Sequence, residues 1–408
     1  MMRLTRLPNG LRVASRDMPG FETVAVGLYA DAGSRHEPDA VNGIAHLFEH
    51  MVFKGAGGRS AREISETVED VGGDLNASTD RDSTNFAATM LAEHMPLGVE
   101  LLADLILNAH LDPQELEREK DVVLQELAEA RDTPGDIIFD ELWSAAFGDQ
   151  PLGRSVLGDE ASIARITAAD LLAWRSEHFR ADNVCLVAAG KVDHEALVAQ
   201  AESRLGRLSG GTPALCEQAA FTADRRVLRG RSDQAHLTFA FPGPAATSRD
   251  YPAARLFADI LGGGASSRLF QAVREERGLA YSVSASAYAY ADIGIMSVHA
   301  ATSARNALAA SQLIAELIEQ TAADLTEKEL DRAKTQARAG LLMSLESTWG
   351  QANFVARQLS LHDRLVEPAE VLEASAHVTV DQVRAIGAAM TSGPRASASI
   401  GTPAVRAA

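Results

Sequence analysis

Residues 111–120 have the sequence LDPQELEREK and residues 325–334 have the sequence LTEKELDRAK, so the pattern L-x-x-x-E-L-[DE]-R-x-K occurs twice, 214 positions apart. Two pairs of shorter upstream segments resemble each other in the same order along the chain: Ala25–Tyr29 with Leu237–Phe241, and Leu47-Phe48 with Leu256-Phe257. Self-similarity over such a span indicates a duplicated structural unit. The chain is therefore expected to hold two similar domains.

Each copy combines strand-like and helix-like segments. In the first copy, the alternating stretch from Thr23 to Tyr29 predicts a strand, and the stretch from about Val41 to Phe53 predicts a helix. The expected fold class is α+β, with two homologous α/β domains that each have a mostly antiparallel sheet and helices packed on one face. Because residues 209–213 (SGGTP) have linker composition, the boundaries are placed at 1–208, a linker at 209–216, and 217–408.

The composition excludes several classes of protein. The chain has 408 residues, of which 46% are hydrophobic and 23% charged, and charges interrupt its apolar runs, so no membrane-spanning segment is expected. The N-terminus has neither a secretory nor an organellar presequence pattern, which favours the cytoplasm. The net charge of −18 argues against nucleic acid and anionic membranes, and favours a basic partner or substrate. Cys185 and Cys216 have no CxxC partner and are expected to be buried thiols.

The segment His46-Leu47-Phe48-Glu49-His50 has the residue types and spacing of a catalytic metal site. On a helix, residues four apart share a face, so His46 and His50 can offer two imidazole nitrogens to one zinc ion. Glu49 lies close enough to that face to act as a general base on an attacking water. The order H-x-x-E-H is the signature of the inverzincin peptidases. The alternative is a helix whose histidines are ordinary surface or core residues.

A zinc peptidase needs a third protein ligand, and the helix expected after Pro113 offers several carboxylates. The candidates are Glu115, Glu117, Glu119, Glu126 and Glu129. Glu119 and Glu126 are seven residues apart and share a face, so one could bind the metal while the other supports it. Spacing alone leaves this choice open.

The chain from Arg6 to about Leu208 resembles the pitrilysin and mitochondrial-processing-peptidase family, in particular its short bacterial members. The segments that carry the resemblance are Leu7–Leu11, His46–Gly55, Asn76–Thr79, Glu119–Glu126 and Pro151–Arg154. The resemblance implies that Glu126 is the third zinc ligand and that Glu119 is a supporting carboxylate. It also implies a role in peptide binding for Asn76 and Ala77, where an extended peptide could add to an edge strand.

The resemblance extends through the second half to about Gly401. There Arg274 and Tyr281, seven apart, look like the family's substrate-binding pair, whose guanidinium and phenol can hydrogen-bond a substrate carbonyl. The glycine-rich run from Leu261 to Ser267 lacks the Lys-Ser/Thr ending of a phosphate-binding P-loop, so a turn is expected.

The repeat itself limits the number of metal sites. Alignment of the two copies places Arg255, Ala258, Asp259 and Gly340 opposite the metal and base residues of the first copy, so one Zn²⁺ per chain is expected. The sequence thus predicts a zinc-dependent metalloendopeptidase acting on extended or unfolded peptides. The alternative is a non-catalytic scaffold or regulatory subunit of the same fold. The resemblance implies that one chain forms half of a clamshell chamber. Because this chain has both the metal motif and the Arg274/Tyr281 pair, two copies of it are expected to form a homodimer.

Overall fold

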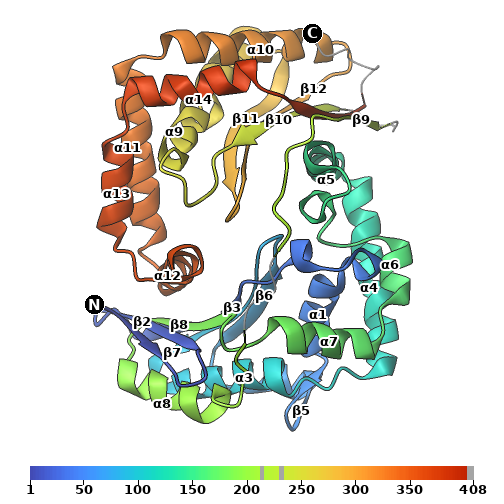
Figure 1. Cartoon of the computed structure of the whole chain (residues 1–408), viewed down its shortest axis with the longest axis vertical. Coiled ribbons are helices and arrows are strands. Elements are labelled where there is room, and N and C mark those ends of the chain that lie inside the picture. The colour runs from blue at the N-terminus through green and yellow to red at the C-terminus, as the bar shows by residue number, and fades with distance from the viewer. Residues whose placement is uncertain (212–215, 229–233, 402–408) are drawn as a thin grey trace. The chain divides into compact units, whose positions relative to one another are not determined.

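The computed structural model describes residues 1–211, 216–228 and 234–401, and the chain forms two compact units (Figure 1). The first unit contains Met1–Ala128, Ser155–Glu217 and Leu342–Val366, and the second contains Glu129–Arg154, Gln218–Leu341 and Glu367–Ala408. This division differs from the sequence-based boundaries, because each unit includes a stretch from the other half of the chain. Residues 212–215 of the expected linker lie outside the described residues.

The first unit is built on a six-stranded sheet in the order β1-β2-β8-β3-β7-β6. Neighbouring strands in this sheet run antiparallel, except for β2 and β8, which are parallel to each other. The strands are β1 (Met2–Arg6), β2 (Arg12–Asp17), β8 (Val184–Gly190), β3 (Thr23–Ala30), β7 (Thr84–Leu91) and β6 (Asp74–Thr79). A short hairpin is formed by β4 (Gly55–Ala56) and β5 (Arg59–Ser60).

The helices of this unit cover both faces of the sheet. They are α1 (Ile44–Val52), α2 (Ala61–Glu69), α3 (Met95–Leu107), α4 (Pro113–Asp132, its last turn in the second unit), α6 (Glu160–Arg165), α7 (Ala168–His178), α8 (His194–Leu205) and α12 (Thr348–His362). Along β3, Val24 and Val26 belong to the main core with α1 and α3, whereas Ala25 between them faces α12. The alternation of side chains on a strand produces these two faces.

The second unit repeats most of this topology, with five strands in its sheet instead of six. Its sheet has the order β11-β12-β10-β13-β9, antiparallel except for β13 and β9. The strands are β11 (Ala280–Ala289), β12 (Gly294–Thr302), β10 (Ala235–Gly243), β13 (Ala396–Ile400) and β9 (Arg225–Leu228). The order β6-β7-β3-β8 of the first sheet thus corresponds to β11-β12-β10-β13, which confirms the duplication predicted from residues 111–120 and 325–334.

The helices of the second unit are α5 (Pro134–Phe147), α9 (Tyr251–Gly262), a π-helical segment (Phe270–Glu276), α10 (Ala307–Asp324), α11 (Glu327–Ser344, its last turn in the first unit), α13 (Pro368–Ala376) and α14 (Val380–Ser392). Single turns of 3-10 helix occur at Ser34–His36, Asp39–Val41, Ala92–His94 and Pro151–Gly153. No helix within the described ranges is long and apolar enough to cross a bilayer.

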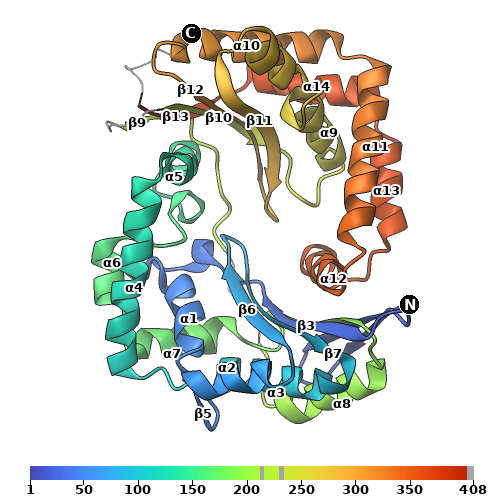
Figure 2. The same ribbon diagram turned by 180° about the vertical axis from the view of Figure 1, so that it is seen from behind.

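Two helices explain why the units differ from the sequence-based division. In the first unit, Val355 and Leu359 of α12 pack against Ala14, Cys185 and Val187 on the second face of the sheet. In the second unit, α5 packs against β10 and β13 in the equivalent way (Figure 2). Each sheet therefore has its second face covered by a helix that the sequence order alone assigns to the other half. The predicted α+β class and the mostly antiparallel sheets are confirmed. The expectation that helices pack on only one face of each sheet is wrong, because α12 and α5 cover the second faces.

Candidate metal centre

Helix α1 is fixed at its N-terminus by a buried carboxylate. Glu37 Oε2 accepts hydrogen bonds from the Gly43 N–H (2.7 Å) and from Asn42 Nδ2 (2.6 Å), and Glu37 Oε1 accepts from the Ala45 N–H (2.8 Å). Gly43 has φ +95°, which favours glycine. A negative charge at a helix N-terminus is stabilised by the unpaired N–H groups there. Glu37 had no role assigned from the sequence, because it lies farther from the helix than the two or three residues over which an ordinary N-cap side chain acts.

The apolar side chains of α1 decide which residues face away from the core. Leu47, Phe48 and Met51 are fully buried, whereas His46, Glu49 and His50 are partly exposed on the remaining face. The packing of α1 therefore presents both histidines and the glutamate together, as the H-x-x-E-H spacing predicts.

Helix α4 brings a third candidate ligand to the two histidines. Glu126 Oε2 lies 3.6 Å from His50 Nε2 and 3.8 Å from His46 Nε2. One ligand atom from each residue lies within 4.8 Å of the others, and no other group of this kind occurs in the part of the chain that the structure describes. The Glu126 side chain is 41% exposed, so the centre is open to solvent.

These three residues fit a zinc ion. The distances from Glu126 Oε2 to the two histidine nitrogens are longer than a hydrogen bond. In a tetrahedral zinc site with zinc–ligand distances of about 2.0–2.1 Å, neighbouring ligand atoms lie roughly 3.3 Å apart. The distances observed here are close to that value. Burial, and then the neighbouring His50, lower the pKa of His46 to about 4, so its imidazole is neutral at pH 7. Neutral imidazole is the form that binds a metal. Two histidines and one glutamate also form the ligand set of several catalytic zinc sites.

A second carboxylate of α4 supports the centre. Glu119 is 5% exposed, and its Oε2 lies 3.2 Å from His50 Nδ1 while its Oε1 lies 2.7 Å from Lys54 Nζ. This arrangement orients His50 so that Nε2 points toward Glu126. Glu115 and Glu117, which spacing left open as ligands, instead pair with Arg118 and Lys120 on α4.

Glu49 is the candidate base. Its Oε2 accepts a hydrogen bond of 2.5 Å from Thr79 Oγ1 at the end of β6. Burial raises the pKa of Glu49 above its usual value, the Thr79 hydrogen bond and His50 oppose this shift, and Glu126 adds to it. A carboxylate with a raised pKa beside a metal centre is suited to proton transfer near neutral pH.

Asn76 and Ala77 lie on β6, which is the edge strand of the first sheet. Side chains alternate along it, so Asn76 is exposed while Ala77 packs against the core. Asn76 Oδ1 accepts a hydrogen bond of 2.9 Å from the Ala77 N–H. An edge strand carries backbone groups that an added peptide strand can pair with.

Arg274 and Tyr281 lie in the second unit. The guanidinium carbon of Arg274 lies 4.6 Å from the ring centroid of Phe270, and its Nε lies 3.8 Å from a Glu275 carboxylate oxygen. Tyr281 is 66% exposed, and the pairing of β11 with β12 shifts register between Ala280 and Ser282. Such a bulge re-aims the side chain that it carries.

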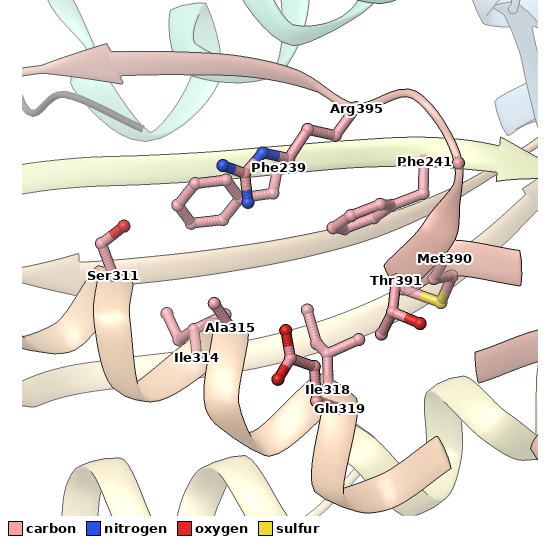
Figure 3. Close-up of a pocket in the computed structure, with 11 residues that line it drawn as sticks. Phe239, Phe241, Ser311, Ile314, Ala315, Ile318, Glu319, Met390, Thr391 and Arg395 are labelled. Atoms are coloured by element: carbon pink, nitrogen blue, oxygen red, sulfur yellow. The ribbon is translucent and has the colours of Figure 1, made fainter. Parts of the chain in front are cut away.

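A cavity of about 340 Å³ also lies in the second unit, between β10, α10 and the end of α14. Phe239 and Phe241 of β10 face the α10 side chains across it, and Arg395 and Glu319 also line it (Figure 3). None of the predicted site residues lines this cavity.

Lys54 and Thr79 had no role assigned from the sequence, although both lie in segments that carry the family resemblance. Lys54 lies two residues after the end of α1, and Thr79 ends the Asn76–Thr79 motif. Their positions in these motifs could have marked them as candidate site residues. Their contacts with Glu119 and Glu49, however, depend on tertiary structure.

Two family models match the chain. Residues 12–160 match the model described as Insulinase (Peptidase family M16), and residues 165–337 match the one described as Peptidase M16 inactive domain. The second match covers much of the repeat copy in which Arg255, Ala258 and Asp259 stand opposite His46, Glu49 and His50.

Bacterial relatives named uncharacterized zinc proteases are similar over nearly their whole length. One from Rickettsia felis is 33% identical over 382 residues, covering 93% of this chain and 92% of that protein. One from Mycobacterium tuberculosis is 35% identical over 391 residues, covering 94% and 89%. One from Bacillus subtilis is 34% identical, covering 85% of each chain.

Two solved structures share the fold. A peptidase M16 inactive domain from Pseudomonas fluorescens has a TM-score of 0.90 at 24% identity and covers 99% of this chain and 98% of its own. A protease from Helicobacter pylori has a TM-score of 0.91 at 21% identity and covers 99% of each.

Proposed function

We propose that the chain, which belongs to the M16 (insulinase) family of peptidases, is a zinc-dependent endopeptidase. It would hydrolyse peptide bonds in extended or unfolded peptides. The observation that carries the proposal is the convergence of His46, His50 and Glu126 beside the carboxylate of Glu49. A zinc ion held by the first three residues would supply Lewis-acid polarisation of the attacking water and of the scissile carbonyl.

The protein's own residues then handle the protons and the substrate. The Glu49 carboxylate takes a proton from the attacking water and returns it to the leaving amine as the peptide bond breaks. Glu119, held by Lys54, keeps His50 in its ligand orientation.

We place the extended peptide along the edge strand β6, where Asn76 and Ala77 would contact its backbone. The exposed Arg274 and Tyr281 would add hydrogen-bond donors for a substrate carbonyl. The acidic balance of the chain favours basic peptides.

We propose that the protein acts as a homodimer in the cytoplasm. Static light scattering would test the dimer, and a stable, fully active monomer would contradict it.

The decisive experiment is digestion of a mixed peptide library by the zinc-loaded protein, followed by mass spectrometry of the products. We expect internal cleavage by the wild type, and loss of cleavage both after chelation and in the Glu49→Gln variant, which should still bind one zinc per chain. A Glu49→Gln variant that binds zinc and still cleaves would overturn the proposed role of Glu49.

The same experiment separates the alternative of a non-catalytic subunit. The second repeat copy has Arg255, Ala258 and Asp259 opposite the metal and base residues and keeps the corresponding strand order, so the fold itself does not depend on those residues. A wild type that binds zinc but leaves every library peptide intact would favour that alternative.

A further inference from the structure

A single hydrogen bond joins the edge strand β6 to the base on α1. The Thr79 hydroxyl oxygen lies 2.5 Å from Glu49 Oε2, which is within the short range expected for a hydroxyl donating to a carboxylate. Glu49 therefore receives a donor from a strand that the sequence analysis connected only with substrate.

The hydroxyl protons near Glu49 can be assigned. Each threonine hydroxyl has one proton to donate. Thr84, paired with Thr79 across β6 and β7, donates its proton to the Ala32 carbonyl at 2.8 Å. Its oxygen lies 3.5 Å from Thr79 Oγ1, the limit of hydrogen-bond length. The Thr79 proton is therefore directed to Glu49.

The strand that carries Thr79 is held in place. Leu75 and Ala77, which lie on the same side of β6 as Thr79, pack against the main core, and β6 also contacts α1. Side chains on packed elements are positioned more accurately than those on loops.

We infer that Thr79 is a positioning residue for Glu49: its hydrogen bond to Oε2 fixes the orientation of the carboxylate and leaves Oε1 as the less engaged oxygen, the one that receives the proton. The inference rests on the proposed function, because it assigns the proton-accepting atom of the proposed base. Thr79 also ends the strand on which we place the peptide, so the base and the peptide-binding edge share one fixed element.

The test compares Thr79→Val, which keeps the shape of the side chain but removes the donor, with Thr79→Ser, which keeps the donor. Loss of a supporting hydrogen bond at a metal centre lowers activity roughly 10- to 100-fold. We expect Thr79→Val to lose that much kcat on one library peptide, with KM changed less than threefold and one zinc still bound. Thr79→Ser should recover most of kcat.

Thr89→Val on β7 is the matched control, because Thr89 is a half-buried threonine of the neighbouring strand and lies outside the metal centre. This variant should behave as wild type. Wild-type kcat in Thr79→Val, or an equal loss in Thr79→Ser, would overturn the inference while the proposed function stands. An inactive wild type that binds zinc would instead overturn the proposed function.

A double-mutant cycle tests the contact without any activity. Melting temperatures are compared for metal-free wild type, Thr79→Val, Glu49→Ala and the double variant, because alanine removes both acceptor oxygens whereas glutamine would keep one. Residues that interact give non-additive shifts, so Thr79→Val should lower the melting temperature less in the Glu49→Ala background. Additive shifts would show that the two side chains do not interact, which overturns the inference.

Discussion

His50 Nδ1 lies 3.2 Å from one carboxylate oxygen of Glu119, and the other oxygen of Glu119 lies 2.7 Å from Lys54 Nζ. The buried Glu119 therefore serves an imidazole and an ammonium group at once. An outer carboxylate of this kind fixes the tautomer and orientation of a metal-binding histidine.

We therefore predict that Glu119→Gln weakens zinc binding roughly 10- to 100-fold, because an amide orients the histidine less strongly than a carboxylate does. Competition with a chromophoric chelator measures the affinity. Glu117→Gln is the control, since Glu117 is an exposed residue of the same helix that pairs with Lys120. Equal affinities in the two variants would contradict a role for Glu119.

Zinc should also stabilise the protein through Glu126. A ligand present at a hundred times its Kd stabilises the native state by about 2.7 kcal/mol, so zinc should raise the melting temperature and a chelator should reverse the rise. Glu126→Gln should lose most of this zinc-dependent rise, whereas Glu129→Gln, an exposed position on α4, should keep it. An unchanged rise in Glu126→Gln would exclude it as a ligand.

The sequence predicted what depends on local spacing and on repetition. The four-residue separation of His46 and His50 placed them on one face of α1, and the duplicated pattern predicted two similar domains with mostly antiparallel sheets. Spacing could not select Glu126, because its distance to His50 depends on how α4 packs beside α1. The packing of α12 on the first sheet was also missed, since an apolar stripe does not specify its partner.

The carboxylate of Glu37 should prove important for stability. Both carboxylate oxygens of Glu37 accept a backbone N–H, one from Gly43 and one from Ala45. In Glu37→Gln, an amide nitrogen replaces one of these oxygens, so one N–H donor loses its acceptor. A buried donor left unpaired costs about 1–3 kcal/mol, so urea unfolding should shift to lower concentration. Glu69→Ala, at an exposed position of α2, should leave the midpoint nearly unchanged. A wild-type midpoint in Glu37→Gln would contradict the capping role.

Two histidines of the second sheet should make the stability of the protein depend on pH. On adjacent strands of the second sheet, His236 Nδ1 lies 3.2 Å from His299 Nε2, and the His299 ring packs 5.3 Å from that of Phe139, measured between ring centroids. Burial, and then His236, lower the pKa of His299 to about 4, and burial also lowers the pKa of His236. The unfolded chain, in which histidine has a pKa near 6.5, therefore binds protons before the folded chain does as the pH falls.

Stability should consequently decrease as the pH falls from 7 toward 4, with His299 alone contributing a loss of roughly 3 kcal/mol by pH 4. His299→Gln retains hydrogen-bonding capacity but cannot titrate, so its free energy of unfolding should fall less steeply over this interval. Urea unfolding of both proteins at half-unit pH steps gives the two profiles, and subtracting them removes the other groups that titrate in the same range. Parallel profiles would show that His299 is not held in its neutral form by the fold.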